Sequence, residues 1–161
     1  MADQNDIYKK FGIKSPEPFS VNLSVHVGEE HGDIRLIIKH HLQKLGFKNI
    51  RVHRDGCEVL SALQYEPVDV ALEGDDLLRL NGYDILKELT EDTQALRPAF
   101  VIISKPLNKS EAMFALEKGV DDILVRPITT GDLFPRIKSA YENFTNPKNP
   151  ERLYEYAKAK I

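Results

Sequence analysis

The sequence predicts a doubly wound α/β domain, with five parallel strands and helices on both faces of the sheet. Five short runs rich in β-branched and apolar residues alternate along the chain with segments whose apolar residues recur at helical spacing. One helical segment separates each pair of successive strands, so a crossover connection must join them. Right-handed crossovers produce a parallel sheet with helices on both faces, here a (βα)5 arrangement.

The strands are expected at residues 22–27, 50–53, 68–73, 99–103 and 123–125. Between them, the clearest helical period is in the first helix, where Ile34, Ile38 and Leu42 fall on one side. Each later strand is likewise preceded by a segment of helical period, and a fifth helix follows the last strand.

Residues that start and stop helices stand at the expected boundaries. Gly46 and Gly119 follow the first and fourth helices, where glycine is favoured because it adopts a left-handed backbone. Asp55 is suited to cap the second helix, and Asn108 with Glu111 resembles a capping box for the fourth. These signals agree with the helices that the periodicity predicts.

The start of the fifth helix has two interpretations. Thr129 and Asp132 form a cap pair that would begin the helix at once. Pro135 then falls past the first turn, where it removes a backbone hydrogen bond. The helix therefore either begins later, near Asp132, or is kinked.

Length and charge exclude several classes of protein. The chain has 161 residues, 42% of them hydrophobic, which suits one domain of ordinary size with a full core. Its 22 Lys and Arg and 25 Asp and Glu give a net charge of −3 and form no basic stripe, so nucleic acid is not expected as a partner. No apolar run approaches the roughly 20 residues of a membrane span. With one cysteine, Cys57, and no secretory signal, the chain is expected in the cytoplasm.

The ends of the chain read as extensions of this domain. Residues 1–20 form an expected N-terminal arm, in which Pro16 and Pro18 favour an extended linker. Residues 21–144 form the domain, and residues 145–161 read as a linker followed by a short helix. That helix is either a docking element or the first turns of a further helical unit.

Polar residues gather where the strands are expected to end. Such ends are Glu29, Glu30 and His31 after the first strand, Glu73 to Asp76 after the third, Ser104 after the fourth and Arg126 after the fifth. In an open parallel sheet, ligands and catalytic groups collect at the carboxyl ends of the strands. His31 beside two glutamates is a conceivable metal ligand, but a solvated histidine at a helix start is the favoured interpretation.

Three motifs together resemble one family. The run LIIKHHLQKLGFKNIRVHRDGCEVLSAL is similar to the first helix, second strand and second helix of the receiver domains of two-component response regulators, of the chemotaxis type. Asn81-Gly82 resembles the Asp-Gly that follows the family's third strand, and GVDDILVRP resembles its GADDYLxKP. The match spans about residues 21–144. It implies the flavodoxin-like receiver fold and a role in two-component signalling or a phosphorelay.

The resemblance also implies where the family's chemistry would lie. Two acids after the first strand and an aspartate after the third hold Mg²⁺, and this aspartate accepts the phosphoryl group. The acid pair falls on Glu29 and Glu30, and the acceptor falls on Gly74, which has neither a nucleophilic oxygen nor a metal ligand. The expected pocket is therefore degenerate, with no catalytic residue and no cofactor. Its residues are Glu29, Glu30, Gly74, Asp75, Ser104 and Arg126.

Two further positions depart from the family pattern. Arg126 replaces the lysine of the KP motif, and Ile123 replaces the aromatic residue that changes rotamer on activation. Ser104 keeps the family's hydroxyl. Cys57 is interpreted as structural.

The leading hypothesis is a receiver-like domain that binds a protein partner without phosphorylation, and that is not an enzyme. The alternative is a phosphoacceptor that uses Asp75 or Asp76 with Mg²⁺, for which the weak metal candidates are Glu29, Glu30 and Asp76. By resemblance, the partner or a second copy would bind the face of the fourth helix, fifth strand and fifth helix. Candidates for this surface are Phe114, Ile123, Pro135, Lys138, Tyr141 and Phe144. The alternative is that these residues belong to the core.

Overall fold

A five-stranded parallel sheet forms the centre of the molecule and confirms the predicted fold class. The computed structural model describes residues 16–92 and 97–146. Within them the strands lie in the order β2-β1-β3-β4-β5, and every neighbouring pair is parallel. The strands are β1 (Val25–Gly28), β2 (Ile50–His53), β3 (Val70–Gly74), β4 (Ala99–Ser104) and β5 (Asp122–Val125).

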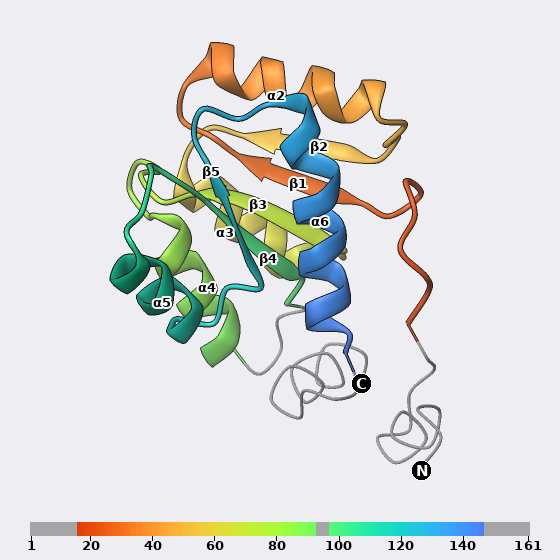
Figure 1. Cartoon of the computed structure of the whole chain (residues 1–161). Helices are drawn as coiled ribbons and strands as arrows, with labels where there is room; N and C mark the ends of the chain where they lie inside the picture. The colour runs from red at the N-terminus through yellow and green to blue at the C-terminus, as the bar shows by residue number, and fades with distance from the viewer. Residues whose placement is uncertain (1–15, 93–96, 147–161) are drawn as a thin grey trace.

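Helices cover both faces of the sheet, as Figure 1 shows. They are α2 (Gly32–Lys44), α3 (Gly56–Tyr65), α4 (Gly82–Glu91), α5 (Lys109–Glu117) and α6 (Thr130–Phe144). Ile38 of α2 and Ile137 of α6 belong to one buried cluster, whereas Val59 of α3, Ile85 of α4 and Ala115 of α5 belong to the other. The sheet is therefore doubly wound.

The predicted helix boundaries hold where they rest on capping chemistry. Asp55 accepts hydrogen bonds from the backbone N–H groups of Cys57 and Glu58 at the start of α3. Asn108 and Glu111 form the reciprocal pair at α5, with both bonds 2.8 Å long. Gly46 and Gly119 both have φ +102°, in the region that favours glycine.

The two interpretations of the last helix are resolved in favour of the early start. Helix α6 begins at Thr130 and contains Pro135. The Thr129 hydroxyl donates to the Asp132 carboxylate across 2.7 Å, so the predicted pair forms between side chains and not with the helix backbone. The late start near Asp132 is wrong.

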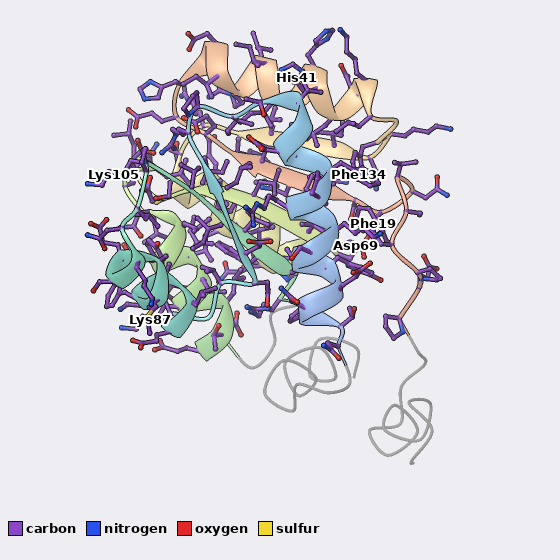
Figure 2. The ribbon with its side chains drawn as sticks, viewed as in Figure 1. Phe19, His41, Asp69, Lys87, Lys105 and Phe134 are labelled. Atoms are coloured by element: carbon purple, nitrogen blue, oxygen red, sulfur yellow. The ribbon has the colours of Figure 1, made fainter. Side chains whose placement is uncertain are left out.

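The described part of the N-terminal arm packs against the domain. The ring of Phe19 lies 5.3 Å from that of Phe134 (Figure 2) and 6.3 Å from that of Phe47. The Tyr141 hydroxyl donates to the backbone carbonyl of Glu17 across 2.7 Å. Residues 1–15 and the predicted C-terminal helix lie outside the described residues. None of the described helices has the length and apolar character that would span a membrane.

Candidate functional site

Arg126 connects three strand ends at the carboxyl edge of the sheet. It follows β5, and its guanidinium reaches the loops after β1 and β3, which are neighbours in the sheet. Nη1 lies 3.0 Å from Oδ1 of Asp75, while Nη2 lies 3.2 Å from Oε2 of Glu29 and 2.9 Å from Oδ1 of Asp76. One planar fork therefore binds three carboxylates.

This cluster is buried on one side and open on the other. The side chains of Glu29 and Asp76 are 0% and 51% exposed, and that of Arg126 is 20% exposed. Burial works to lower the pKa of Arg126, but the hydrogen bond to Asp75 and the charge of Glu29 outweigh it and raise the pKa. The guanidinium is therefore a permanent positive charge at the centre of the site.

Gly74, to which the resemblance assigns the acceptor position, lies directly beside this guanidinium. A Cβ atom placed on Gly74 would lie 3.3 Å from Nη2 of Arg126 and 3.3 Å from Oδ1 of Asp76. These separations are tight, so a side chain at position 74 would enter space that the ion cluster now lines. Position 74 carries no nucleophile, and the guanidinium of Arg126 occupies the space beside it.

Two other predicted pocket residues do not join the cluster. Ser104 donates its hydroxyl to the carbonyl of Lys105 across 2.7 Å. The backbone carbonyl of Glu30 accepts from Arg35, which is not part of the cluster. Within residues 16–92 and 97–146, no group of three or more His, Cys, Asp or Glu side chains has a geometry that would hold a metal ion.

A second polar cluster joins β3, β1 and β2 and was missed by the sequence analysis. Nδ1 of His26 lies 2.6 Å from Oε1 of Glu73, and Nε2 of His26 lies 2.8 Å from Nδ1 of His53. His26 and Glu73 are both 0% exposed. The available signal was a histidine and a glutamate inside strands that are otherwise apolar, because buried polar groups almost always have partners.

The predicted partner surface is only partly exposed. Phe114 on α5 is 55% exposed, and Pro135 and Lys138 of α6 are also exposed. Ile123 is half-buried. The expectation that Tyr141 lies on this surface is not met, because the arm covers it and leaves it 7% exposed.

Phe144 is likewise a core residue at 3% exposure, with the guanidinium of Arg97 4.6 Å from the centre of its ring. The exposed apolar residues at this end of the sheet instead include Met113 and Leu116 of α5 and Val125 of β5. A shallow groove along α5 is lined by Lys109, Ser110, Met113, Phe114 and Glu117.

The sheet order, the acidic carboxyl edge and the position of Gly74 can be compared with known proteins. The sequence model of the response regulator receiver domain matches residues 25–138. The chain belongs to the response regulator receiver family. This receiver domain is 23% identical over 121 residues to chemotaxis protein CheY-3 of Vibrio cholerae, covering 75% of this chain and 93% of that protein. It is 27% identical over 104 residues to chemotaxis protein CheY1 of Helicobacter pylori, covering 64% and 84%.

Solved structures show the same fold. The receiver domain of the Francisella response regulator 1452 superposes with a TM-score of 0.68 at 25% identity, covering 75% of this chain and 98% of that one. The receiver domain of the sensor histidine kinase PA1611 from Pseudomonas aeruginosa superposes with a TM-score of 0.66 at 18% identity, covering 74% and 98%. That structure holds a magnesium ion in its active-site cleft. By its family, the protein is a receiver domain of two-component signalling.

Proposed function

We propose that this receiver domain transmits its signal by binding a protein partner without being phosphorylated. The observation that carries this proposal is the Arg126 cluster, which binds Glu29, Asp75 and Asp76 around a glycine at the acceptor position. The family's reaction needs a carboxylate nucleophile and Mg²⁺ at this place. In this chain, the nearby carboxylates are already paired with the guanidinium of Arg126.

Charge and geometry both disfavour Mg²⁺ in this cluster. Mg²⁺ requires nearly octahedral oxygen ligands at about 2.0–2.1 Å. Glu29 and Asp75 would have to leave Arg126 to supply them, and the guanidinium would then be a positive charge beside the incoming ion. The same contacts oppose the alternative in which Asp75 or Asp76 accepts a phosphoryl group. Arg126 thus supplies, at this place, the positive charge that a metal ion supplies in the family's reaction.

The surface of α5 and β5 is the best candidate for partner binding. Met113, Phe114 and Leu116 are each more than half exposed, and Val125 continues the apolar character onto β5. Lys118 lies with its ammonium 4.9 Å from the centre of the Phe114 ring. Aromatic residues, including phenylalanine, and methionine are enriched at protein interfaces. A cytoplasmic signalling protein is the expected partner, and a second copy of the domain is the alternative.

Phosphorylation can be tested directly on the full chain. We expect no added phosphoryl group in the intact mass after incubation with Mg²⁺ and acetyl phosphate. An adduct that maps to Asp75 or Asp76 would overturn the proposal and establish the shifted acceptor.

Binding is tested with a candidate partner by comparing Phe114→Ala with Tyr65→Ala. Both residues are exposed aromatics, but Tyr65 lies on α3, whereas Phe114 lies on α5. We expect only Phe114→Ala to weaken binding. Equal loss in both variants, or in neither, would place the interface elsewhere.

A further inference from the structure

Charges that are mixed along the whole chain separate between the two faces of the sheet. Residues 34–54, which form most of α2 and all of β2, contain six Lys and Arg and no Asp or Glu. Residues 55–92, which form α3, β3 and α4, contain eleven Asp and Glu and two Lys and Arg. Ile38 places α2 in one buried cluster, whereas Val59 and Ile85 place α3 and α4 in the other. The basic helix and the acidic helices therefore cover opposite faces of the sheet.

The solvent-facing side of α2 carries an apolar pair beside lysines. Leu36 is 66% exposed and Ile37 is 51% exposed. Lys39 and Lys44 follow them on the helix, and Lys48 follows in the next turn of the chain. Among residues 16–92 and 97–146, no ion pair includes any of these lysines. We define the basic face as Leu36, Ile37, Lys39, Lys44 and Lys48.

An apolar residue and three carboxylates lie on the opposite side, at α3 and α4. Leu78 is 56% exposed, and its backbone carbonyl accepts from the first residue of α3 across 2.9 Å. Asp84, Glu88 and Glu91 are exposed on α4 and belong to no ion pair in the described part of the chain. Lys87 is the one basic residue of that helix. We define the acidic face as Leu78, Asp84, Glu88 and Glu91.

The order of residues along the two faces is complementary. In a parallel sheet, each connecting helix runs back from the carboxyl end of one strand to the amino end of the next, so α2, α3 and α4 run in the same direction. Leu36 and Ile37 precede the lysines of the basic face, and Leu78 precedes the carboxylates of the acidic face. Stacking a second copy on the first in the same orientation would bring apolar against apolar residues and ammonium against carboxylate groups.

We propose that copies of this receiver domain associate head to tail, with the basic face of one copy bound to the acidic face of the next. Because the two faces differ, the contact is heterologous, and each bound copy keeps a free face for another. Complementary charge sets the register of such a contact, and the exposed apolar residues lose their contact with water. The matching acidic face belongs to the chain itself, which favours a second copy over a foreign anion. This inference does not rest on the proposed partner binding, because α5 and β5 contribute no residue to either face.

The expected association is weak and depends on salt. The 13 residues of α2 span about 20 Å, so the contact falls at the small end of protein interfaces. Its charges are exposed, and salt screens them. The distance over which charges act falls from about 10 Å at about 0.1 M salt to about 3 Å at about 1 M salt. The contact should therefore form at low salt and be lost at high salt.

Sedimentation of the full chain measures this association. Between about 10 μM and about 1 mM protein in about 0.1 M salt, we expect the weight-average mass to rise past that of a dimer. In about 1 M salt the mass should return to that of the monomer. A monomeric mass throughout would overturn the proposal, and so would an equal rise at both salt concentrations.

Two charge-reversed variants separate a specific contact from an effect of net charge. Lys44→Glu/Lys48→Glu lowers the net charge by four, and Glu88→Lys/Glu91→Lys raises it by four. Since the wild type has a net charge of −3, a net-charge effect alone would make the second variant associate more than the wild type. The proposal predicts instead that each variant is monomeric, because like charges then face each other.

Mixing these two variants gives the sharper result. Every contact between unlike copies again joins ammonium groups to carboxylates, so an equimolar mixture should recover masses above that of a dimer. A mixture that stays monomeric would contradict the head-to-tail contact, as would stronger association of Glu88→Lys/Glu91→Lys alone.

The apolar part of the contact is tested with Leu36→Asn. Leu116→Asn is the matched control, because Leu116 is 51% exposed on α5, where the proposed partner surface lies. We expect only Leu36→Asn to lower the association of the wild type. Loss in Leu116→Asn alone, or equal loss in both variants, would assign the association to another surface and reject this one.

Duplex DNA is the other ligand that a lysine-rich face could bind, and it is tested in the same buffer of about 0.1 M salt. We expect no binding of a labelled duplex by the wild type. Binding that disappears in Lys44→Glu/Lys48→Glu, in a wild type that does not self-associate, would assign the basic face to nucleic acid in place of a second copy.

Discussion

The guanidinium of Arg126 lies 3.2 Å from the carboxylate of Glu29, a side chain that is 0% exposed. A buried carboxylate needs such a partner, because an isolated charge in the protein interior is strongly unfavourable. Glu29 also accepts from the backbone N–H of His31, but across a longer 3.3 Å. The ion pair therefore matters to folding as well as to the chemistry of the site.

Replacing Arg126 by methionine should destabilise the fold. Methionine keeps much of the side-chain volume but leaves Glu29 unpaired, so we expect the free energy of unfolding to fall by about 3 kcal/mol. Arg136→Met is the matched control, because Arg136 is 54% exposed in its pair with Asp122 and should contribute less than about 1 kcal/mol. Urea unfolding of both variants at pH 7 measures the difference. Equal stabilities would contradict the importance of the Arg126 pair.

Restoring an aspartate at position 74 should not restore phosphorylation by itself. The new carboxylate would lie beside Nη2 of Arg126 and form another ion pair in place of binding Mg²⁺. We expect little phosphoryl labelling of Gly74→Asp by acetyl phosphate, and more in the double variant Gly74→Asp/Arg126→Lys, which restores the family's lysine. Efficient labelling of the single variant would show that the ion pairs of Arg126 break readily to allow Mg²⁺ binding.

The sequence predicted the fold because each strand and helix carries its own period and capping residues. Asp55 and Asn108 cap helices through hydrogen bonds to residues two or three positions away, and such local chemistry can be read from the sequence. The family motifs likewise placed Gly74, Glu29 and Arg126 at one edge of the sheet. The contacts of Arg126 with Asp75 and Asp76 were not predicted, because they depend on how far one side chain reaches between loops.

Contacts between distant segments account for what the sequence could not predict. The apolar period of α6 does not distinguish a core tyrosine from a surface one, and the hydroxyl of Tyr141 donates to the carbonyl of Glu17, which is 124 residues away. The polar residues His26 and Glu73 are separated by 47 residues and become partners only when β1 and β3 pair.

Substitution of Glu73 by glutamine tests the neutral form of its carboxyl group. A glutamine amide can donate to Nδ1 of His26 as a protonated carboxyl would, so a neutral Glu73 predicts a loss of less than about 1 kcal/mol at pH 7. Because the folded-state pKa of Glu73 is raised by burial, its contribution is complete below about pH 4.5 and is lost as the pH rises through that raised pKa. Glutamine does not titrate, so the variant should gain stability relative to the wild type toward alkaline pH.

Urea unfolding from pH 6 to pH 9 checks this expectation. A loss of about 3 kcal/mol or more at pH 7 would instead indicate an ionised Glu73 paired with a charged His26, because breaking a buried ion pair costs about that much.

Removal of the Phe19 ring should release the arm from the domain. This ring contacts Phe47, Phe134 and Tyr141 but is only partly buried, so we expect Phe19→Ala to lower the free energy of unfolding by about 2 kcal/mol, below the range for a fully buried phenylalanine. Amide exchange should also show lost protection near Tyr141, whose hydroxyl bond to Glu17 requires a docked arm. Tyr65→Ala is the control, because Tyr65 is 83% exposed and its removal should change stability by less than about 0.5 kcal/mol. Indistinguishable stabilities of these two variants would mean that the arm contributes nothing to the fold.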